Sequence, residues 1–350
     1  MKNITKIVVS LFASFAIAFS AFAGELTVTG TAKATYATLS GKANGNNGLG
    51  VANELGFGAS GELDNGWTWN YAIALDPDTT AAGGNALNDD SSLTMSTPYG
   101  SFAVCASACG LSAAGDFNAN SYAWITDTGY GEGKIEPVNI SSYSNIQYHT
   151  PAGLLPFGIV GKIGYATSGD TSLQSSNASG IARSSTVGAT TMYRIEAAPI
   201  DGLKVTASFA EQDQASGVST DEQDSESGAI SAKYSAGSFT VGLGRTWVAP
   251  RLANFSGSVG ATTVESYEAT NVSVGFVVND SLSISFSDES SEPTYATSTT
   301  VGYEQDTQSV QAAYTMGGMT LAVAHTNYDN VGYVNNADVT ETILSVSMAF

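Results

Sequence analysis

The chain has 350 residues and is strongly acidic: 32 Asp and Glu residues stand against 12 Lys and Arg, which gives a formal net charge of −20 at pH 7. This balance leaves no basic patch that could neutralise phosphates, so it excludes nucleic acid as a partner. The two cysteines, Cys105 and Cys109, form no metal-ligand set, and only His149 and His325 could join them. We therefore expect neither a metal centre nor a cofactor.

The first 23 residues have the composition of a secretory signal peptide. Lys2 and Lys6 precede an apolar run from Ile7 to Phe22, and an Ala-x-Ala cleavage motif ends at Ala23. The run falls short of the ~20 residues that a membrane-spanning helix needs. We expect cleavage after residue 23 and a single domain over residues 24–350.

The rest of the chain alternates apolar and polar residues over short segments, which predicts β-strands with one apolar face. In the clearest segment, large apolar residues occupy every second position from Trp67 to Leu75. The predicted strands are Glu25–Leu39, Asn53–Leu63, Trp67–Leu75, Leu93–Thr97, Ser101–Ser107, Tyr143–Thr150, Phe157–Thr167, Ser185–Ala198, Leu203–Glu211, Gly228–Tyr234, Phe239–Trp247, Tyr267–Val278, Leu282–Ser287, Ser309–Met316, Met319–Thr326 and Val339–Phe350.

Short turns and long polar connections alternate between these strands. The turns carry residues that tight hairpins require, as in Asp64-Asn65-Gly66 and Gly317-Gly318. This alternation is typical of outer-membrane barrels, with turns on the periplasmic side and loops outside. The even count of sixteen predicts an all-β fold, a transmembrane antiparallel up-and-down barrel whose first and last strands pair, because lipid tolerates no open sheet edge. Side chains cannot fill so wide a barrel, so its interior must hold water.

One connection differs from the others. Ala108–Ser142 is Gly-rich and acidic, and it has no sustained period of 2 or 3.6 residues. A connection of this length without periodicity is usually functional or disordered. We expect it to fold into the mouth of the barrel and narrow the channel; the alternative is a loop outside the barrel whose charges are simply solvated.

The combination of signal peptide, sixteen alternating strands, terminal Phe350 and a longest loop between strands five and six resembles the general diffusion porins of Gram-negative outer membranes. The resemblance covers residues 24–350. It implies that the third loop folds inward to form the constriction and that the barrels associate as homotrimers. In place of the Pro-Glu-Phe-Gly-Gly string of enterobacterial members, this loop has Gly129–Gly133.

The candidate functional residues are charged groups of the loop and of the wall. An inward loop would bring its acids opposite lumen-facing bases and create a transverse field that orients dipolar solutes; the alternative is that each base merely solvates the channel wall. The loop residues are Asp116, Asp127, Glu132 and Glu136, with the single base Lys134. The wall bases are Lys33, Lys162, Arg194, Lys204 and Lys233.

Three smaller features leave alternatives open. Arg245 has the parity of the lipid face, so either a bulge shifts it or it lies at the headgroup rim. Acidic clusters at 221–226 and 288–292 are either solvated surface charge or sites where Ca²⁺ or Mg²⁺ bridges the outer surface. Cys105 and Cys109 lie about 13 Å apart on a continuous strand, so a disulfide requires a turn just after Cys105; free buried thiols are the alternative.

The sequence thus predicts a water-filled channel in the outer membrane, in contact with lipid, that passes small hydrophilic solutes and ions by diffusion and prefers cations. The alternatives are a solute-specific channel and a structural or adhesive surface barrel. No recognisable Ser–His–acid grouping surrounds His149 or His325, so we expect no enzyme activity. Small outward residues such as Gly30, Ala32 and Gly61 favour a homotrimer packed through the strands near the chain ends.

Overall fold

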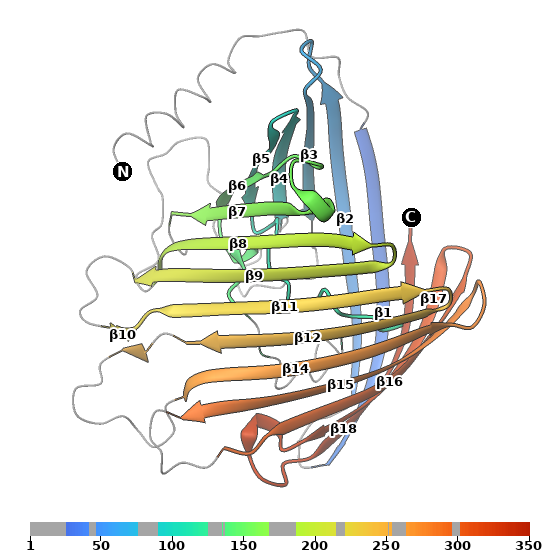
Figure 1. Ribbon diagram of the computed structural model, residues 1–350. Helices are drawn as coiled ribbons and strands as arrows, with labels where there is room; N and C mark the ends of the chain where they lie inside the picture. The colour runs from blue at the N-terminus through green and yellow to red at the C-terminus, as the bar shows by residue number, and fades with distance from the viewer. Residues whose placement is uncertain are drawn as a thin grey trace.

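The computed structural model describes residues 26–41, 47–75, 90–124, 135, 137–167, 187–214, 221–250, 252–253, 264–295 and 302–350. The predicted signal peptide, residues 1–23, lies outside them. Sixteen antiparallel strands form a closed barrel in which β1 pairs with β18 (Figure 1). The predicted barrel is therefore confirmed. No helix among the described residues is long and apolar enough to cross a membrane.

Each barrel strand pairs with the strands that precede and follow it around the sheet. The barrel strands are β1 (Leu26–Gly41), β2 (Gly48–Glu62), β3 (Thr68–Leu75), β4 (Asp90–Thr97), β5 (Gly100–Ala106), β6 (Asn145–His149), β7 (Val160–Ala166), β8 (Val187–Ile200), β9 (Leu203–Gln214), β11 (Ser225–Ala236), β12 (Phe239–Ala249), β14 (Val264–Val277), β15 (Leu282–Tyr295), β16 (Gln305–Met316), β17 (Met319–Asp329) and β18 (Val339–Ala349). The smaller elements are a two-stranded sheet of β10 (Asp221–Gln223) and β13 (Leu252–Ala253), and the 3₁₀ turns η3 (Ile140–Ser142), η4 (Pro156–Gly158) and η5 (Val331–Tyr333).

Several strands are longer than predicted at the end where the long connections leave the barrel. β2 begins at Gly48 rather than Asn53, β15 ends at Tyr295 rather than Ser287, and β16 begins at Gln305 rather than Ser309. The extensions of β15 and β16 are polar on both faces, so they lack the apolar alternation from which strands were recognised. The extension of β2 instead consists of glycine and apolar residues, with Leu49 and Val51 on the outer face. The prediction was also wrong at Phe157, which lies in η4 with φ 58° and not in β7.

The barrel separates an apolar outer face from a polar inner face. Residues that pair across neighbouring strands point to the same side of the sheet, so the register assigns each position to the outer or the inner face. Leu243, Phe286 and Leu344 lie on the outer face, and each is about half exposed. The inner face holds buried polar residues such as Ser273 and Ser309. A lipid-facing wall around a polar interior requires this arrangement.

Aromatic rings cover glycines on the outer wall. A Cβ added at Gly30 would lie 3.1 Å from the nearer Cδ of Phe350, and one at Gly61 would lie 2.8 Å from Nε1 of Trp69. Rings from neighbouring strands therefore already fill the space above these glycines. The small size of Gly30 and Gly61 consequently does not support contact with a second protein wall, contrary to our reading of the sequence.

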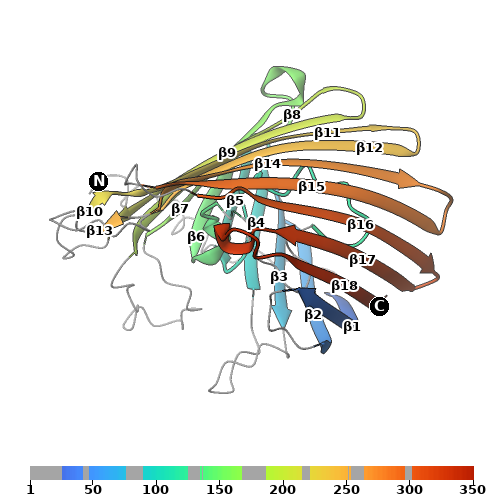
Figure 2. The same cartoon turned by 90° about the horizontal axis from the view of Figure 1, so that it is seen from below.

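The two ends of the barrel differ. The tight turns β8–β9, β11–β12, β14–β15 and β16–β17 lie together at one end, on the right in both views (Figure 2). Strands β5, β6 and β7 are only five to seven residues long. The loop predicted to be functional leaves the barrel between β5 and β6.

Candidate functional site

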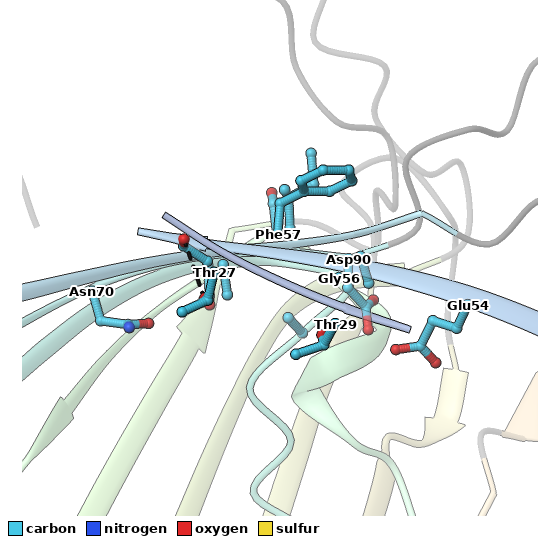
Figure 3. Close-up of a pocket in the computed structure, with 14 residues that line it drawn as sticks. Thr27, Thr29, Glu54, Gly56, Phe57, Asn70 and Asp90 are labelled. Atoms are coloured by element: carbon cyan, nitrogen blue, oxygen red, sulfur yellow. Dashed lines mark hydrogen bonds between the residues drawn. The ribbon is translucent and has the colours of Figure 1, made fainter. Parts of the chain in front are cut away.

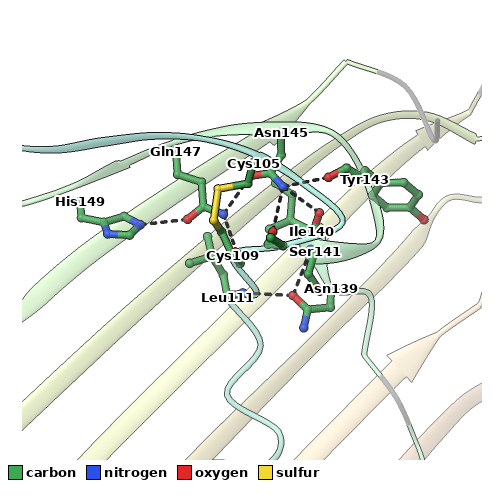
Figure 4. The surroundings of a disulfide bond; sticks show 11 residues. Cys105, Cys109, Leu111, Asn139, Ile140, Ser141, Tyr143, Asn145, Gln147 and His149 are labelled. Atoms are coloured by element: carbon green, nitrogen blue, oxygen red, sulfur yellow. Dashed lines mark hydrogen bonds between the residues drawn. A yellow bond between two sulfur atoms is a disulfide. The ribbon is translucent and has the colours of Figure 1, made fainter. Parts of the chain in front are cut away.

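A disulfide fixes the point where the long loop leaves the wall. Cys105, near the end of β5, is bonded to Cys109, and their Cα atoms are 6.1 Å apart. The chain turns between them with positive φ at Ser107 (52°) and Cys109 (63°), which is the turn that the spacing of the cysteines required. Gln147 of β6 donates from Nε2 to the Cys109 carbonyl at 2.5 Å, and Asn145 donates to the Ala108 carbonyl at 3.3 Å (Figure 4). The loop therefore departs at a fixed angle.

Beyond the disulfide, hydroxyl and amide side chains of successive strands hold the loop backbone. Ser208 of β9 accepts from Ala113 N at 2.9 Å, Ser273 of β14 accepts from Ala119 N at 2.9 Å, and Gln311 of β16 accepts from Tyr122 N at 2.9 Å. These wall positions all belong to the inner face. The described part of the loop therefore runs along the inside of the barrel, past β9, β14 and β16.

The loop also packs on a floor of small and apolar inner residues. Leu111 and Ile140 form a buried cluster with Met192 of β8 and the alanines of β7 and β9, Ala166 and Ala210. These contacts place an apolar core between the described part of the loop and the wall. Inward apolar side chains therefore serve to dock the loop here.

Glycines of β12 allow the closest approach of the loop. A Cβ at Gly242 would lie 2.7 Å from the backbone carbonyl carbon of Phe117, and one at Gly244 would lie 3.0 Å from Cγ of the Phe117 ring. Phe117 is 1% exposed and meets Trp124 edge-to-face, with centroids 5.8 Å apart. Only residues without side chains leave room for this ring against the wall.

The described part of the loop forms an ion pair with Arg194 of β8, which is 7% exposed. Its guanidinium donates to the Ser112 carbonyl at 2.6 Å and forms an ion pair with Asp116. Glu196 bridges Arg194 and Lys162, with distances of 2.7 Å to Arg194 Nε and 2.6 Å to Lys162 Nζ. Asp116 and Arg194 were expected to face each other across an open constriction; instead they are in direct contact, because the loop lies against this wall.

The other wall bases also lie on the inner face. The ammonium of Lys33 on β1 is 4.7 Å from the ring centroid of Tyr122, so the loop reaches across to the first strand. Lys233 donates to the Asn118 carbonyl at 3.3 Å, and Lys204 lies opposite Lys233 in the register. The loop residues Asp127, Glu132, Lys134 and Glu136 lie outside the described residues.

Arg245 lies on the outer face of β12, in regular register and without a bulge. It is 60% exposed and forms an ion pair with Glu268 of β14 at 2.5 Å. Of the two alternatives, the structure therefore excludes the bulge. The charge of Arg245 therefore lies outside the lumen.

The proposed acidic cluster at 288–292 is not a cluster. Asp288, Glu289 and Glu292 all lie on β15, where successive side chains point to opposite faces of the sheet. Glu289 points inward and is 3% exposed, whereas Asp288 and Glu292 point outward. Among the described residues, no group of three or more Asp, Glu, His or Cys side chains could hold a metal ion. The structure therefore does not support the hypothesis that Ca²⁺ or Mg²⁺ binds at residues 288–292.

Opposite the docked loop, a cavity of about 450 Å³ opens along the inner wall of β1 to β4. Thr27, Thr29, Glu54, Asn70 and Asp90 line it, and Figure 3 shows them on one side of the sheet with Phe57 on the other. A second cavity of about 360 Å³ lies between loop residues 118–121 and the turn-side ends of β11, β12 and β14. The described part of the loop thus covers one part of the inner wall, and the larger of these two cavities lies along another part.

The anchors of the loop were not recognised in the sequence. Inner-face serines such as Ser208 and Ser273 look like any lumen-facing serine, and their role depends on a loop about 100 or more positions away in the chain. The glycines at 242 and 244 did carry a signal, because glycine at two successive inward positions of one strand indicates close approach of another backbone.

No curated protein matches the chain by sequence. Among solved structures, OmpF of Salmonella typhi in complex with daunomycin superposes with a TM-score of 0.67 at 14% identity, over 93% of this chain and 98% of that one. An anion-selective porin from Comamonas acidovorans gives 0.64 at 15% identity, over 93% and 100%. OmpT of Vibrio cholerae in its trimer form gives 0.64 at 12% identity, over 94% and 100%.

At these identities the neighbours establish the fold alone. The family described as Gram-negative porin, in contrast, matches residues 6–350, nearly the whole chain. A closed barrel with an apolar exterior and many buried polar residues on its inner face agrees with that match. The chain belongs to the Gram-negative porin family.

Proposed function

We propose that this porin forms a water-filled channel in the outer membrane through which small hydrophilic solutes and ions diffuse, with cations preferred and no chemical step. The proposal includes removal of residues 1–23 as a signal peptide, a lipid-facing outer wall, and residues 108–142 as the constriction loop.

The observation that carries the proposal is the uneven covering of the inner wall. The described part of the loop is held to β8, β9, β11 and β14 to β16, whereas a cavity extends along β1 to β4. A barrel that served only as a scaffold for surface loops would need neither the docked loop nor the open side. A loop that narrows a lumen without closing it supports passage of solutes.

The charges of the lumen support a preference for cations. On the inner face and the described part of the loop, the carboxylates of Glu54, Glu62, Asp90, Asp116, Glu196, Glu289 and Glu341 outnumber the bases of Lys33, Lys162, Arg194, Lys204 and Lys233. The formal charge of the whole chain, −20, has the same sign. Fixed negative charge raises the local concentration of cations. One neighbour is named anion-selective, so the shared fold does not decide this property.

Homotrimer assembly is also part of the proposal. The V. cholerae neighbour is described as a trimer form, and the outward alanines Ala32, Ala34 and Ala59 remain as small residues on β1 and β2. Native mass measurement in mild detergent tests it: a trimer is expected, and a monomer alone would contradict it.

Planar-bilayer recording tests the channel itself. We expect stable conductance steps and, under a KCl gradient, a reversal potential displaced toward that of K⁺. Its displacement should grow at low ionic strength, where screening is weak. A correctly folded barrel that gives no steps would refute the channel and favour an adhesive or structural role; displacement toward Cl⁻ would refute the cation preference alone.

A further inference from the structure

The cavity along β1 to β4 exists because its floor has almost no side chains. Gly56 and Gly58 of β2 and Ala72 and Ala74 of β3 occupy neighbouring inward positions and line the cavity. Larger residues would fill this space, as Met192 does beneath the docked loop. The floor is therefore a shallow bowl in the wall of the lumen.

Threonines of β1 lean over the glycines of β2. A Cβ at Gly56 would lie 2.6 Å from Thr29 Oγ1, and one at Gly58 would lie 2.7 Å from Thr27 Oγ1. Thr27 donates its hydroxyl hydrogen to the Gly58 carbonyl at 3.3 Å. That hydrogen bond leaves the hydroxyl oxygen as an acceptor at the edge of the bowl.

Two carboxylates lie at the other edge, toward the end of the long connections. Glu54 precedes Gly56 by two residues on β2. Asp90 of β4 pairs with Ala74 of β3, which in turn pairs with Gly56, so Asp90 lies two strands away from Gly56 at the same height in the sheet. Strand spacing and rise place their Cα atoms about 12 Å apart. The amide of Asn70 also faces the bowl (Figure 3), and none of the described residues that line the cavity is basic.

The nearest base in the register is Lys33, whose position on β1 is diagonal to that of Glu54. Its ammonium is held over the Tyr122 ring, 4.7 Å from the centroid, and Lys33 does not line the cavity. The bowl therefore combines negative charge, hydroxyl and amide acceptors and a floor of small residues. A small solute group with one positive charge and several N–H donors would be attracted by the negative charge, would donate to the acceptors and would fit above the small residues of the floor.

We propose that this bowl is a binding subsite for small organic solutes that carry a primary ammonium group, with Glu54 as its main charge partner. The inference rests on the proposed channel function and goes beyond it, because a diffuse negative lumen would attract any cation equally. A primary ammonium has three N–H donors for the acceptors of the bowl, and hydrogen bonds between charged partners are stronger than neutral ones. A quaternary ammonium has the same charge and no donor, so the bowl should discriminate against it.

The test uses single channels of the full protein in KCl, with ethanolamine added at millimolar concentration and neutral pH. Ethanolamine should reduce the K⁺ current through wild type in a saturable way, and tetramethylammonium at the same concentration should not. Glu54→Gln should raise the half-effect concentration of ethanolamine about tenfold, the size expected for loss of one charge-assisted hydrogen bond.

Glu62→Gln is the matched control, because Glu62 is an exposed inward acid on the same strand and outside the cavity. It should leave the half-effect concentration within about twofold, a change of at most ~0.4 kcal/mol. Ala72→Leu fills the bowl without changing charge and should weaken the ethanolamine effect as Glu54→Gln does.

Equal shifts in Glu54→Gln and Glu62→Gln would overturn the subsite, because they would reveal a diffuse charge effect. Equal action of tetramethylammonium, or an unchanged response in Ala72→Leu, would overturn it as well. Conductance steps in KCl without any ethanolamine effect refute only the subsite, whereas the absence of steps in wild type refutes the proposed channel.

Discussion

Arg194 should contribute more to the stability of the docked loop than any other single side chain. It is 7% exposed and contacts the Ser112 carbonyl, Asp116 and Glu196. Arg194→Gln leaves two carboxylates near the wall without their shared cation. Loss of one partner from a buried ion pair costs about 3–5 kcal/mol; since Asp116 is 25% exposed, we expect the lower end, about 3 kcal/mol.

Arg245 provides the matched control. Its ion pair with Glu268 lies on the outer wall, where Arg245 is 60% exposed and Glu268 48% exposed. Exposed pairs contribute about 0–1 kcal/mol, so Arg245→Gln should change stability little. Both substitutions remove one arginine charge. Arg194→Gln removes the ion pairs with Asp116 of the loop and Glu196 of the wall, whereas Arg245→Gln removes one exposed pair that does not involve the loop.

Two assays separate the variants. Denaturant unfolding in detergent should give a lower midpoint for Arg194→Gln than for Arg245→Gln, and single-channel recording should give a noisier current only for Arg194→Gln. In a double-mutant cycle, Asp116→Asn should cost less in the Arg194→Gln background than in wild type. Equal midpoints and equally quiet currents would mean that Arg194 does not hold the loop against the wall.

Three further results are expected. Replacing Cys105 and Cys109 by Ser should lower stability by only about 2 kcal/mol or less, because the closed ring is short, but it should increase current noise; a quiet current would mean that the disulfide does not fix the loop. Gly244→Val should lower the unfolding midpoint, since its Cβ would lie 3.0 Å from a loop ring atom, whereas Gly48→Val, with nothing within 4 Å, should not; equal midpoints would contradict the close approach. Burial raises the pKa of Tyr333 to about 12, against about 10 for an unfolded tyrosine, so its contribution to stability is complete below pH ~10 and is lost as pH rises toward 12; ultraviolet titration showing ionisation near pH 10 in the folded protein would contradict this.

The barrel could be predicted from the sequence because period 2 is a local property. From Trp67 to Leu75, apolar residues at every second position identify one lipid-facing strand without knowledge of any other. The even number of strands and the alternation of turns and long connections then predict a closed barrel, as the structure shows. The same reasoning failed at Glu289, where the strand continues beyond the apolar band and the pattern ends.

The docking of the loop could not be predicted, because it depends on contacts distant in the chain. Ser208 binds the backbone of Ala113, 95 positions earlier, and nothing near Ser208 marks it as an anchor. The direct pairing of Asp116 with Arg194 likewise follows from where the loop lies, and the charges alone are compatible with an open gap. The turn after Cys105 was different, since the geometry of a disulfide four residues apart requires it.

A cross-link at the contact between Ala119 and Ser273 can show whether the loop lies inside the barrel while the channel conducts. The backbone nitrogen of Ala119 is 2.9 Å from Ser273 Oγ on the inner wall of β14. Cysteines at both positions, joined by a short thiol-reactive cross-linker, would tie the loop to the wall. We predict complete cross-linking in the membrane-inserted protein and a single-channel conductance equal to that of wild type. Failure to cross-link, or a conductance that changes once the link forms, would mean that the conducting channel holds its loop elsewhere.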